Sequence, residues 1–478
     1  MLSKGDLASL IKDDLLPAWR KEKERLDRID RWYRWQPDEM RLPRHATPEL
    51  RALRTLSQVP WLGLVVTSTA QCMFVDGYRS ALDPVDADRD GLEDGRTPEP
   101  VGPYRIWLAN GFDQRQMALH RAMLAYGYTY ATALPGEDFR GDPMPVLRGV
   151  SPRRMYAAYE DPAEDDWPRY AMRVLADTET ATRVKVYDEQ WVYTVRLRNG
   201  VEVSGEDPMT LEDVAQHGSS VCPVVRYAND LDLDGRTRGE VEPNISLAGR
   251  INKTSYDRML TQHYNSWKIR YVAGMAAPDT EEGAVRQAMK LAQMDFLMAE
   301  DADTKFGVLP ETGLAGFIDA HMADVETLAA VTQTPTHELT GKLINVSAEG
   351  LAMIRASQMQ KVHEAQKSAG KSHAQLLRLA SALAKEDDWA EDITGRVTWQ
   401  DTSIRSMAQA VDALGKLATM LQVPVTALWG RVPGVEKADV EDWIALAQEG
   451  DPVEKMHREL ERQAASEQRR ELPAGSDG

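Results

Sequence analysis

The chain has few cysteines, no long apolar run and a shortage of positive charge. Its two cysteines, Cys72 and Cys222, lie far apart, and neither belongs to a CxxC pair or a zinc-ligand spacing. Both are therefore predicted to be ordinary buried thiols in a reducing compartment. No stretch of about 18 or more apolar residues occurs, so no membrane-spanning helix is predicted. The first residues mix acids with apolar residues, which is not typical of a signal peptide.

Common catalytic and nucleotide-binding motifs are also missing. The sequence has no GxxxxGK[ST] phosphate loop, no GxSxG turn and no Gly-rich dinucleotide turn. His337-Glu338 begins like the metalloprotease HExxH motif, but Gly341 stands where the second histidine would be. The chain is therefore not expected to be an enzyme, and no cofactor is required.

The charge balance is acidic. The chain carries 57 basic and 75 acidic residues, a formal net charge of −18. This argues against a protein that grips nucleic acid through its whole surface. It is compatible with an acidic wall that repels phosphate and lets DNA slide past, and equally with charge that only keeps the protein soluble.

The hydrophobic pattern predicts an α+β fold that is mainly helical and has one β-rich lobe. A buried helix at 60–75 is expected to run into a short strand, and short β-rich runs fill 128–203, with a two-residue hairpin turn at Asn199-Gly200. A strand, a helix and a second strand are expected in the insert 267–311. The other helices are predicted at 6–36, 104–110, 113–126, 240–266, 313–333, 347–385, 402–421 and 436–449, and a strand at 395–401.

Two of these helices bear on the later argument. The helix at 347–385 is very long, lacks proline and has Ser347 as a candidate N-cap. The breaker-rich stretch 334–345 precedes it. The helix at 313–333 has a wide apolar stripe at i, i+3, i+4 spacing, formed by Leu314, Phe317, Ile318, His321, Met322, Val325, Leu328 and Ala329.

Two Asp-rich loops offer a candidate metal site. Alternate carboxylates followed by glycine occur in DADRDGLED (86–94) and in DLDLDG (230–235), a pattern that can wrap oxygens around calcium. Neither loop has a glutamate at its twelfth position. A solvated Asp/Gly turn is the alternative for both loops. The candidate calcium ligands are Asp86, Asp88, Asp90 and Asp94.

Three stretches resemble the portal proteins of tailed bacteriophages. The segment 108–134 is similar to the family's Asn-containing helix that leads into a Gly-Tyr strand. The segment 222–260 resembles its turn into the first channel helix, although Gly239-Glu240 stands where the family commonly has Ser-Glu. The segment 334–357 resembles the family's Pro-loop-Asn-Ser passage into a long helix. Together with the order of the elements, the resemblance covers about residues 1–450.

The resemblance implies a portal subunit with long channel and spine helices. It divides the chain into a wing (1–239), a first stem helix (240–266), a clip (267–311), a second stem helix (312–333), a tunnel loop (334–346), a spine helix returning to the wing (347–401) and a crown (402–450). The remainder, 451–478, is charged and poor in apolar residues, which predicts a disordered tail.

The resemblance also implies a function, a set of partners and a site. Such proteins form a dodecameric ring at one capsid vertex of the virion and are assembled in the host cytoplasm. Double-stranded DNA passes through the ring during packaging and ejection. The partners would be the terminase, the major capsid protein and head-completion or adaptor proteins, with no membrane. The channel-loop residues would be Thr340, Gly341, Lys342 and Asn345, with the polar side chains meeting phosphates without reading sequence.

Two other functions stay open at this point. The first is a metal-dependent enzyme acting on nucleic acid, which needs carboxylates from separate elements to converge on metal ions. The Asp-rich loops instead place their acids close together in sequence. The second is a helical scaffold or adaptor protein without a channel. The shape of the purified particle distinguishes these alternatives from a portal ring.

Overall fold

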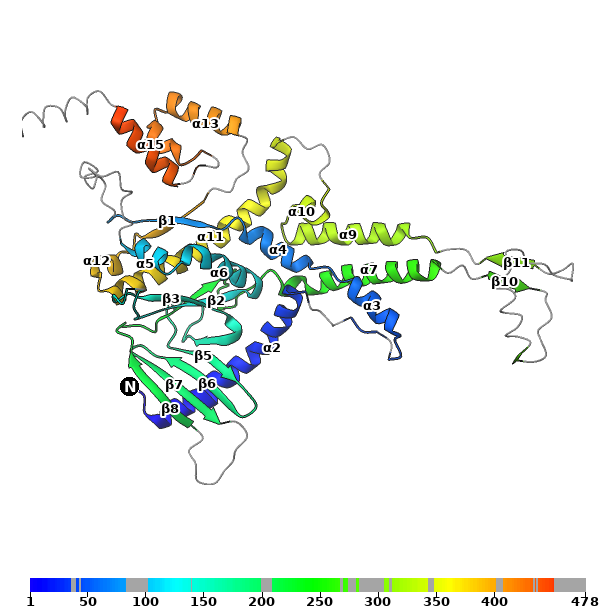
Figure 1. The fold of residues 1–478 in the computed structure, drawn as a ribbon, viewed down its shortest axis with the longest axis horizontal. Coiled ribbons are helices and arrows are strands. Elements are labelled where there is room, and N and C mark those ends of the chain that lie inside the picture. The colour runs from blue at the N-terminus through cyan, green and yellow to red at the C-terminus, as the bar shows by residue number, and fades with distance from the viewer. Residues whose placement is uncertain are drawn as a thin grey trace, which may run out of the picture.

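The computed structural model has an α+β architecture, as the sequence predicts. Helices and several small antiparallel sheets form a body, and one pair of helices projects from it (Figure 1). The structure describes residues 1–35, 40–42, 44–82, 102–138, 140–198, 209–266, 270–273, 281–282, 305–308, 312–342, 348–400, 407–432, 435 and 437–450.

The N-terminal helices cover one face of a five-stranded antiparallel sheet (Figure 1). Apolar residues at helical spacing, among them Leu7, Ile11 and Trp19, pack on alternate residues of the strands, such as Tyr193 and Val195. Alternation with period two is what directs one side of each strand to a core. The elements are α1 (Lys4–Ser9), the π-helical η1 (Leu10–Leu15), α2 (Leu16–Tyr33), β4 (Met155–Ala158), β5 (Tyr170–Asp177), β6 (Ala181–Tyr187), β7 (Trp191–Arg198) and β8 (Met209–Gln216), in the strand order β4-β5-β6-β7-β8.

The largest core surrounds a three-stranded sheet at the centre of the body. Its middle strand is buried along nearly its whole length, because helices and a 3-10 turn pack against it. The elements of this core are α4 (Trp61–Ala70), α5 (Pro103–Ala109), α6 (Phe112–Tyr126), β2 (Tyr128–Leu134), β3 (Val146–Val150), η3 (Pro152–Arg154) and β9 (Val224–Ala228), in the strand order β3-β2-β9. Helix α3 (Pro48–Leu56) has no buried residue and lies outside this core, against α7 (Ile245–Asn265).

A long helix crosses this core and ties the late part of the chain to the early part (Figure 1). Helix α11 (Ala348–Ala384) packs against α4, α5, β2 and β9. The chain then forms α12 (Asp387–Glu391) and returns through β12 (Arg396–Trp399), which pairs antiparallel with β1 (Val75–Arg79). The last described helices are α13 (Met407–Met420), α14 (Val425–Trp429) and α15 (Lys437–Gly450).

The projection consists of two long helices and a small two-stranded antiparallel sheet beyond them (Figure 1). A close backbone approach sets where it begins: a Cβ at Gly239 would lie 2.6 Å from the carbonyl oxygen of Ala125 and from the amide nitrogen of Gly127. Glycine at 239 therefore lets the chain pass the end of α6. The elements are η4 (Glu242–Asn244), α7 (Ile245–Asn265), β10 (Arg270–Ala273), β11 (Lys305–Val308), α9 (Ala315–Val331) and α10 (Thr336–Thr340).

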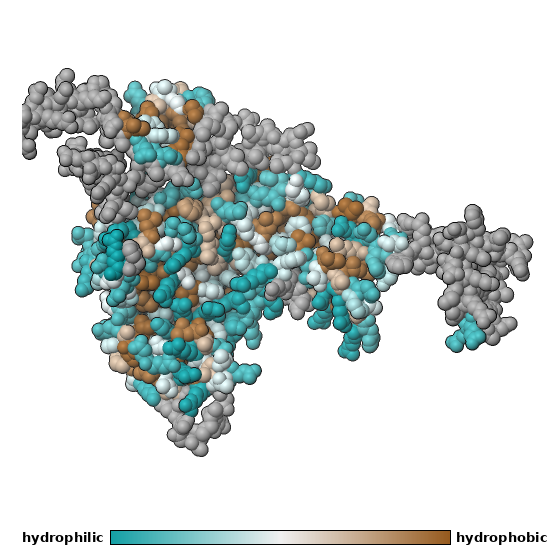
Figure 2. All heavy atoms as spheres, in the orientation of Figure 1, coloured by the Kyte–Doolittle hydropathy of each residue, from teal (hydrophilic) through white to brown (hydrophobic). Residues whose placement is uncertain are grey.

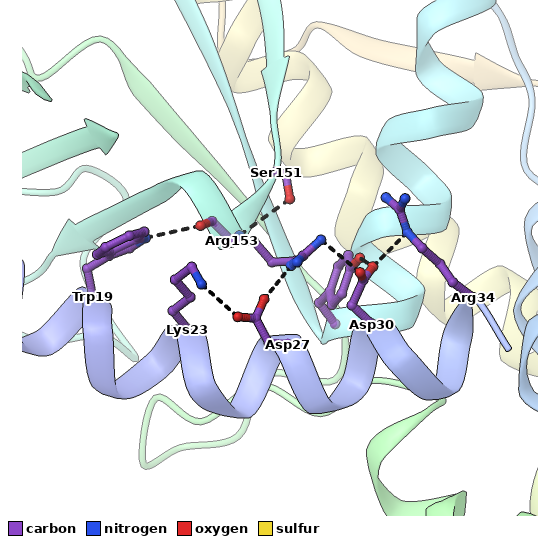
Figure 3. Close-up of polar contacts among 8 residues, drawn as sticks. Trp19, Lys23, Asp27, Asp30, Arg34, Ser151 and Arg153 are labelled. Atoms are coloured by element: carbon purple, nitrogen blue, oxygen red, sulfur yellow. Dashed lines mark hydrogen bonds and ion pairs between the residues drawn. The ribbon is translucent and has the colours of Figure 1, made fainter. Parts of the chain in front are cut away.

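Ion pairs fasten α2 to the turn η3 (Figure 3). The Arg153 guanidinium lies 2.7 Å from Asp27 Oδ1 and 2.8 Å from Asp30 Oδ2. Asp30 is 8% exposed, and it also accepts hydrogen bonds from the Tyr126 hydroxyl at 2.6 Å and from Arg34 Nε at 2.9 Å. These neighbours satisfy a carboxylate that would otherwise be costly to bury.

Most predicted elements are present in the described residues. The predicted turn at Asn199-Gly200 lies outside them, but the register of the described strands on either side differs from that of a two-residue hairpin. Leu197 of β7 pairs with Met209 of β8, so the partner strand begins well beyond Asn199-Gly200. A two-residue turn there would instead have paired Leu197 with Glu202. The sequence prediction relied on a local Asn-Gly signal, and pairing along the whole sheet overrides it.

Both cysteines are buried, as predicted. Cys72 and Cys222 are both free thiols in the core, and burial raises the pKa of Cys222 well above its usual value. A buried neutral thiol of this kind is unreactive. Among the helices of the described part of the chain, none is long and apolar enough to cross a membrane.

Candidate channel segment

Helices α7 and α9 run side by side away from the body (Figure 1). Arg250 of α7 forms an ion pair with Asp324 of α9, with Nη2 and Oδ1 2.8 Å apart. Val325, Leu328 and Ala329 anchor the body end of α9 in the main core. The apolar stripe predicted for this helix is thus confirmed at its C-terminal end, where a core is available to cover it.

The stripe is less buried toward the tip of the projection. Leu314, Phe317, His321 and Met322 are only half-buried, and Ile318 is 48% exposed. The apolar stripe therefore extends beyond what this chain itself covers. The physical reason is that α7 and the body cover one side of α9, whereas the stripe continues around it.

The exposed surface of α9 is acidic or small in character. Asp319 and Glu326 are exposed, together with small residues such as Ala315, Ala323 and Ala330. Between residues 312 and 342 the sequence contains no lysine or arginine before Lys342 itself. Figure 2 shows hydrophilic and apolar residues mixed over the projecting helices. This surface has an excess of negative charge and offers few long side chains that could hold a passing anion.

The chain turns sharply after α9. Gln333 adopts a positive φ of 52°, and the Thr334 amide donates to the Ala329 carbonyl at 3.0 Å. Pro335 is buried and immediately precedes α10. Because proline lacks an N–H group and clashes with a preceding helical turn, it prevents α9 from continuing. The predicted interruption at 334–345 is confirmed over its described part, with the addition of a short helix that the pattern did not predict.

Helix α10 ends at Gly341, which leads to Lys342. Gly341 has a φ of 67°, and its amide donates to the His337 carbonyl at 2.8 Å. Glycine suits this left-handed end because it has no Cβ to strain. Thr340 is half-buried and Lys342 is exposed. The structure therefore groups three of the four predicted channel-loop residues, while Asn345 lies outside the described residues.

Glu338 of α10 belongs to a closed cycle of four side chains, which we call the Glu338 cycle. One carboxylate oxygen accepts from Arg355 Nη2 at 3.0 Å, and the other accepts from the Ser68 hydroxyl. Ser68 in turn accepts from Gln358 Nε2 at 2.5 Å. Arg355 Nε closes the cycle by donating to Gln358 Oε1 at 3.3 Å. The cycle joins α4, α10 and α11.

A second polar contact holds the end of α9. Lys361 of α11 donates to the carbonyl of Thr332, the residue that ends α9, at 2.8 Å. Its ammonium also lies 3.1 Å from a carboxylate oxygen of Glu240, just before α7, and both side chains are 14% exposed. One lysine thus connects the long helix to the bases of both projecting helices.

The predicted calcium ligands lie outside the described residues, as does Ser347. The second Asp-rich loop is described, and there the Asp232 side chain accepts from the amides of Asp234 and Arg236 at 3.0 and 2.7 Å. This is a self-capped turn of the kind that Asp favours. Within the described ranges, no group of three or more His, Cys, Asp or Glu side chains is arranged to hold a metal ion.

The Glu338 cycle was not predicted from the sequence. In the sequence, His337-Glu338 matches only the beginning of a zinc-binding motif, and Ser68 lies 270 residues away from Glu338. One signal was available: Arg355, Gln358 and Lys361 recur at intervals of three and share one face of the long helix. Such a polar stripe on the side that faces the body indicates buried polar partners.

These features define an α+β subunit in which a projecting helical pair is tied to a long helix. Comparison with known proteins gives the family. The chain belongs to the phage portal proteins of the SPP1 Gp6-like family, whose family model matches residues 13–465. No curated protein sequence matches it. Among solved structures, it is similar to a chain from the neck of an empty GTA particle computed with C6 symmetry, at 12% identity over 80% of this chain and 96% of that chain, with a TM-score of 0.46.

Proposed function

We propose that this protein is the ring subunit of a portal at one capsid vertex of a virion, forming the channel through which DNA is packaged and ejected. Membership in the portal family over residues 13–465 is the observation that carries this proposal. The ring would contain twelve copies and would be assembled in the host cytoplasm. The role is structural rather than catalytic.

The projecting helices suit the wall of such a channel. The exposed face of α9 carries Asp319 and Glu326 among alanines, and the helix contains no lysine or arginine. A wall of this charge repels the phosphate backbone, so DNA can move without binding tightly. The half-buried stripe of α9 would be covered by a neighbouring copy, since a ring supplies each subunit with an adjacent surface.

Lys342 is the residue best suited to meet DNA in this segment. It is exposed at the end of α10 and follows a 30-residue stretch, 312–341, that contains no lysine or arginine. A lysine can contact a phosphate as a point charge without reading base sequence. We propose that Thr340, Gly341, Lys342 and Asn345 surround the narrowest part of the channel.

The proposed partners follow from the same assignment. The unit 267–311, which includes the β10–β11 sheet, would be the clip, where the terminase and later the head-completion or adaptor proteins dock. Residues 1–239 would be the wing and α11 the spine, with 402–450 as the crown. The major capsid protein would contact the outside of the ring.

A charge reversal tests the channel assignment. Lys342→Glu should impair packaging or retention of DNA and leave ring formation unchanged, because it alters the charge of the channel at a residue that is exposed in the subunit. Lys367→Glu makes the same change at an exposed position of α11 and is the matched control. Equal packaging by the two variants would contradict the assignment of Lys342.

The structural role has its own test. Purified protein incubated with DNA and divalent metal should leave the DNA intact. Cleavage that Asp90→Ala abolishes would instead support a metal-dependent nuclease and overturn the portal proposal.

A further inference from the structure

Helix α11 presents a polar stripe to the helices that surround its first turns. Arg355, Gln358 and Lys361 lie three residues apart and therefore on one face. Arg355 and Gln358 enter the Glu338 cycle, and Lys361 binds the end of α9. On the following turns the same helix buries apolar residues such as Val362 and Ala365. The stripe thus marks where α11 stops contacting the apolar core and begins to hold the projecting segment.

The Glu338 cycle is shielded from water. Gln358 is fully buried and Ser68 is 7% exposed. The side chains of Glu338 and Arg355 are 20% and 19% exposed. Hydrogen bonds to charged groups are stronger than neutral ones, and they gain strength where water is excluded. Each oxygen of the carboxylate has one donor, so removing its charge leaves a donor without a matched acceptor.

Helix α10 depends on this cycle for its position. It has five residues, far fewer than a helix needs to be stable by itself. Within it, only Leu339 is buried. A single apolar anchor fixes where a helix lies but leaves it free to rotate. The two directed contacts of Glu338, one to α4 and one to α11, remove that freedom.

We propose that Glu338 is a positioning residue, which sets the direction in which the end of α10 presents Lys342. Lys342 follows four residues later, just after the left-handed turn at Gly341. This inference rests on the proposed channel function only for why the orientation of Lys342 matters, which is contact with DNA. The orientation itself can be measured without DNA.

The test compares Glu338→Gln with Glu326→Gln in the full-length protein. Glutamine keeps the size of the side chain but replaces one acceptor oxygen with a donor that faces Ser68 or Arg355. Glu326 is an exposed acid on the neighbouring helix α9, so the same change there is a matched control. The readouts are deuterium exchange at the amides of 336–342, exchange in α4 and α11, and the melting temperature.

Glu338→Gln should speed exchange at 336–342 by about tenfold, which corresponds to the loss of one charge-assisted hydrogen bond. Exchange in the middle of α11 should stay unchanged, and Glu326→Gln should match the wild type everywhere. Unchanged exchange at 336–342 would overturn the inference. A uniform rise across α4, α10 and α11 with a lowered melting temperature would also overturn it, because Glu338 would then be a general stabilising residue.

Ser68→Ala covers the case in which Glu338→Gln does not fold. It removes one arm of the cycle and keeps the Arg355 ion pair, so exchange at 336–342 should rise by a smaller factor; no rise would count against the inference. Failure here is distinguishable from failure of the proposed function. If Lys342→Glu still impairs DNA packaging while exchange in Glu338→Gln is normal, the positioning role is wrong and the channel assignment stands.

Discussion

A buried pair of histidines should make the stability of this protein sensitive to mild acid. His120 of α6 and His373 of α11 are completely buried, and their Nε2 atoms lie 2.8 Å apart. His120 Nδ1 is 3.1 Å from the Met73 carbonyl, which can only accept, so this nitrogen carries the proton. His373 Nε2 must then donate to His120, and the Tyr227 hydroxyl donates to His373 Nδ1 at 2.9 Å.

All four ring nitrogens of the two histidines already take part in hydrogen bonds, so neither ring has a free nitrogen that could accept another proton. Burial lowers the pKa of His120 to about 4, despite the opposing effect of the hydrogen bond that His120 donates to the Met73 carbonyl. Burial and the neighbouring His120 hold the pKa of His373 well below its usual value. Well above pH 6.5, the usual pKa of histidine, these residues are neutral in both the folded and the unfolded state. Below that pH the histidines bind protons in the unfolded chain but stay neutral in the folded protein, so the free energy of unfolding falls.

The size of the effect follows from the two pKa values of His120. A pKa of about 4 in the folded protein, against a model value of 6.5, corresponds to about 3 kcal/mol lost by the time the pH reaches 4. His373 adds to this loss in the same direction. Urea unfolding at a fixed protein concentration, repeated between pH 7 and pH 4, measures the free energy at each pH.

The variant His120→Gln isolates the titrating group. Its amide can donate to the Met73 carbonyl and accept from His373, but it does not titrate. The fall in unfolding free energy between pH 7 and pH 4 should therefore be smaller than in the wild type by about 3 kcal/mol. His363→Gln, at an exposed position of the same helix, should keep the wild-type fall. Equal falls in His120→Gln and wild type would refute the reasoning.

Three further changes have defined outcomes. Asp30→Asn should lower the unfolding free energy by about 2 kcal/mol, because it leaves Arg153 without its buried partner; Asp14→Asn, at an exposed site, should change it by less than about 0.5 kcal/mol. Gly341→Ala should cost about 1 kcal/mol in a thermal melt, since its Cβ would meet no atom within 4 Å and only the positive φ is unfavourable. If the 86–94 loop binds calcium, the ion should raise the melting temperature of the wild type but not of Asp88→Ala; identical curves in calcium and chelator would end that hypothesis.

Local patterns predicted the longer helices well, but not the short helices α3, α10, α12 and α14. The lack of proline over a long stretch predicted α11 almost to its ends, at Ala348–Ala384 against 347–385. The apolar spacing of α9 predicted the burial of Val325, Leu328 and Ala329. These features depend on residues within one or two turns of each other, which is information that a single sequence contains.

Features that depend on distant residues were not predicted. The register of β7 and β8, in which Leu197 pairs with Met209, does not follow the local Asn-Gly signal, because the burial of one sheet face determines which strand residues pair. The apolar pattern of α9 also did not indicate which of its residues the chain itself buries: Val325 is buried and Ile318 is exposed. The Glu338 cycle joins residues 68, 338, 355 and 358; the spacing of Arg355 and Gln358 indicates a polar face on α11, but nothing local identifies Ser68 and Glu338 as its partners.

Single-particle imaging of the purified protein tests the central proposal most directly. We expect closed rings with a central hole, in which the end of α10 and Lys342 lie nearest the axis and the exposed face of α9 lines the wall of the channel. A protein that stays monomeric at all concentrations and salt conditions, or a ring that places residues 334–346 on its outer rim, would contradict this proposal.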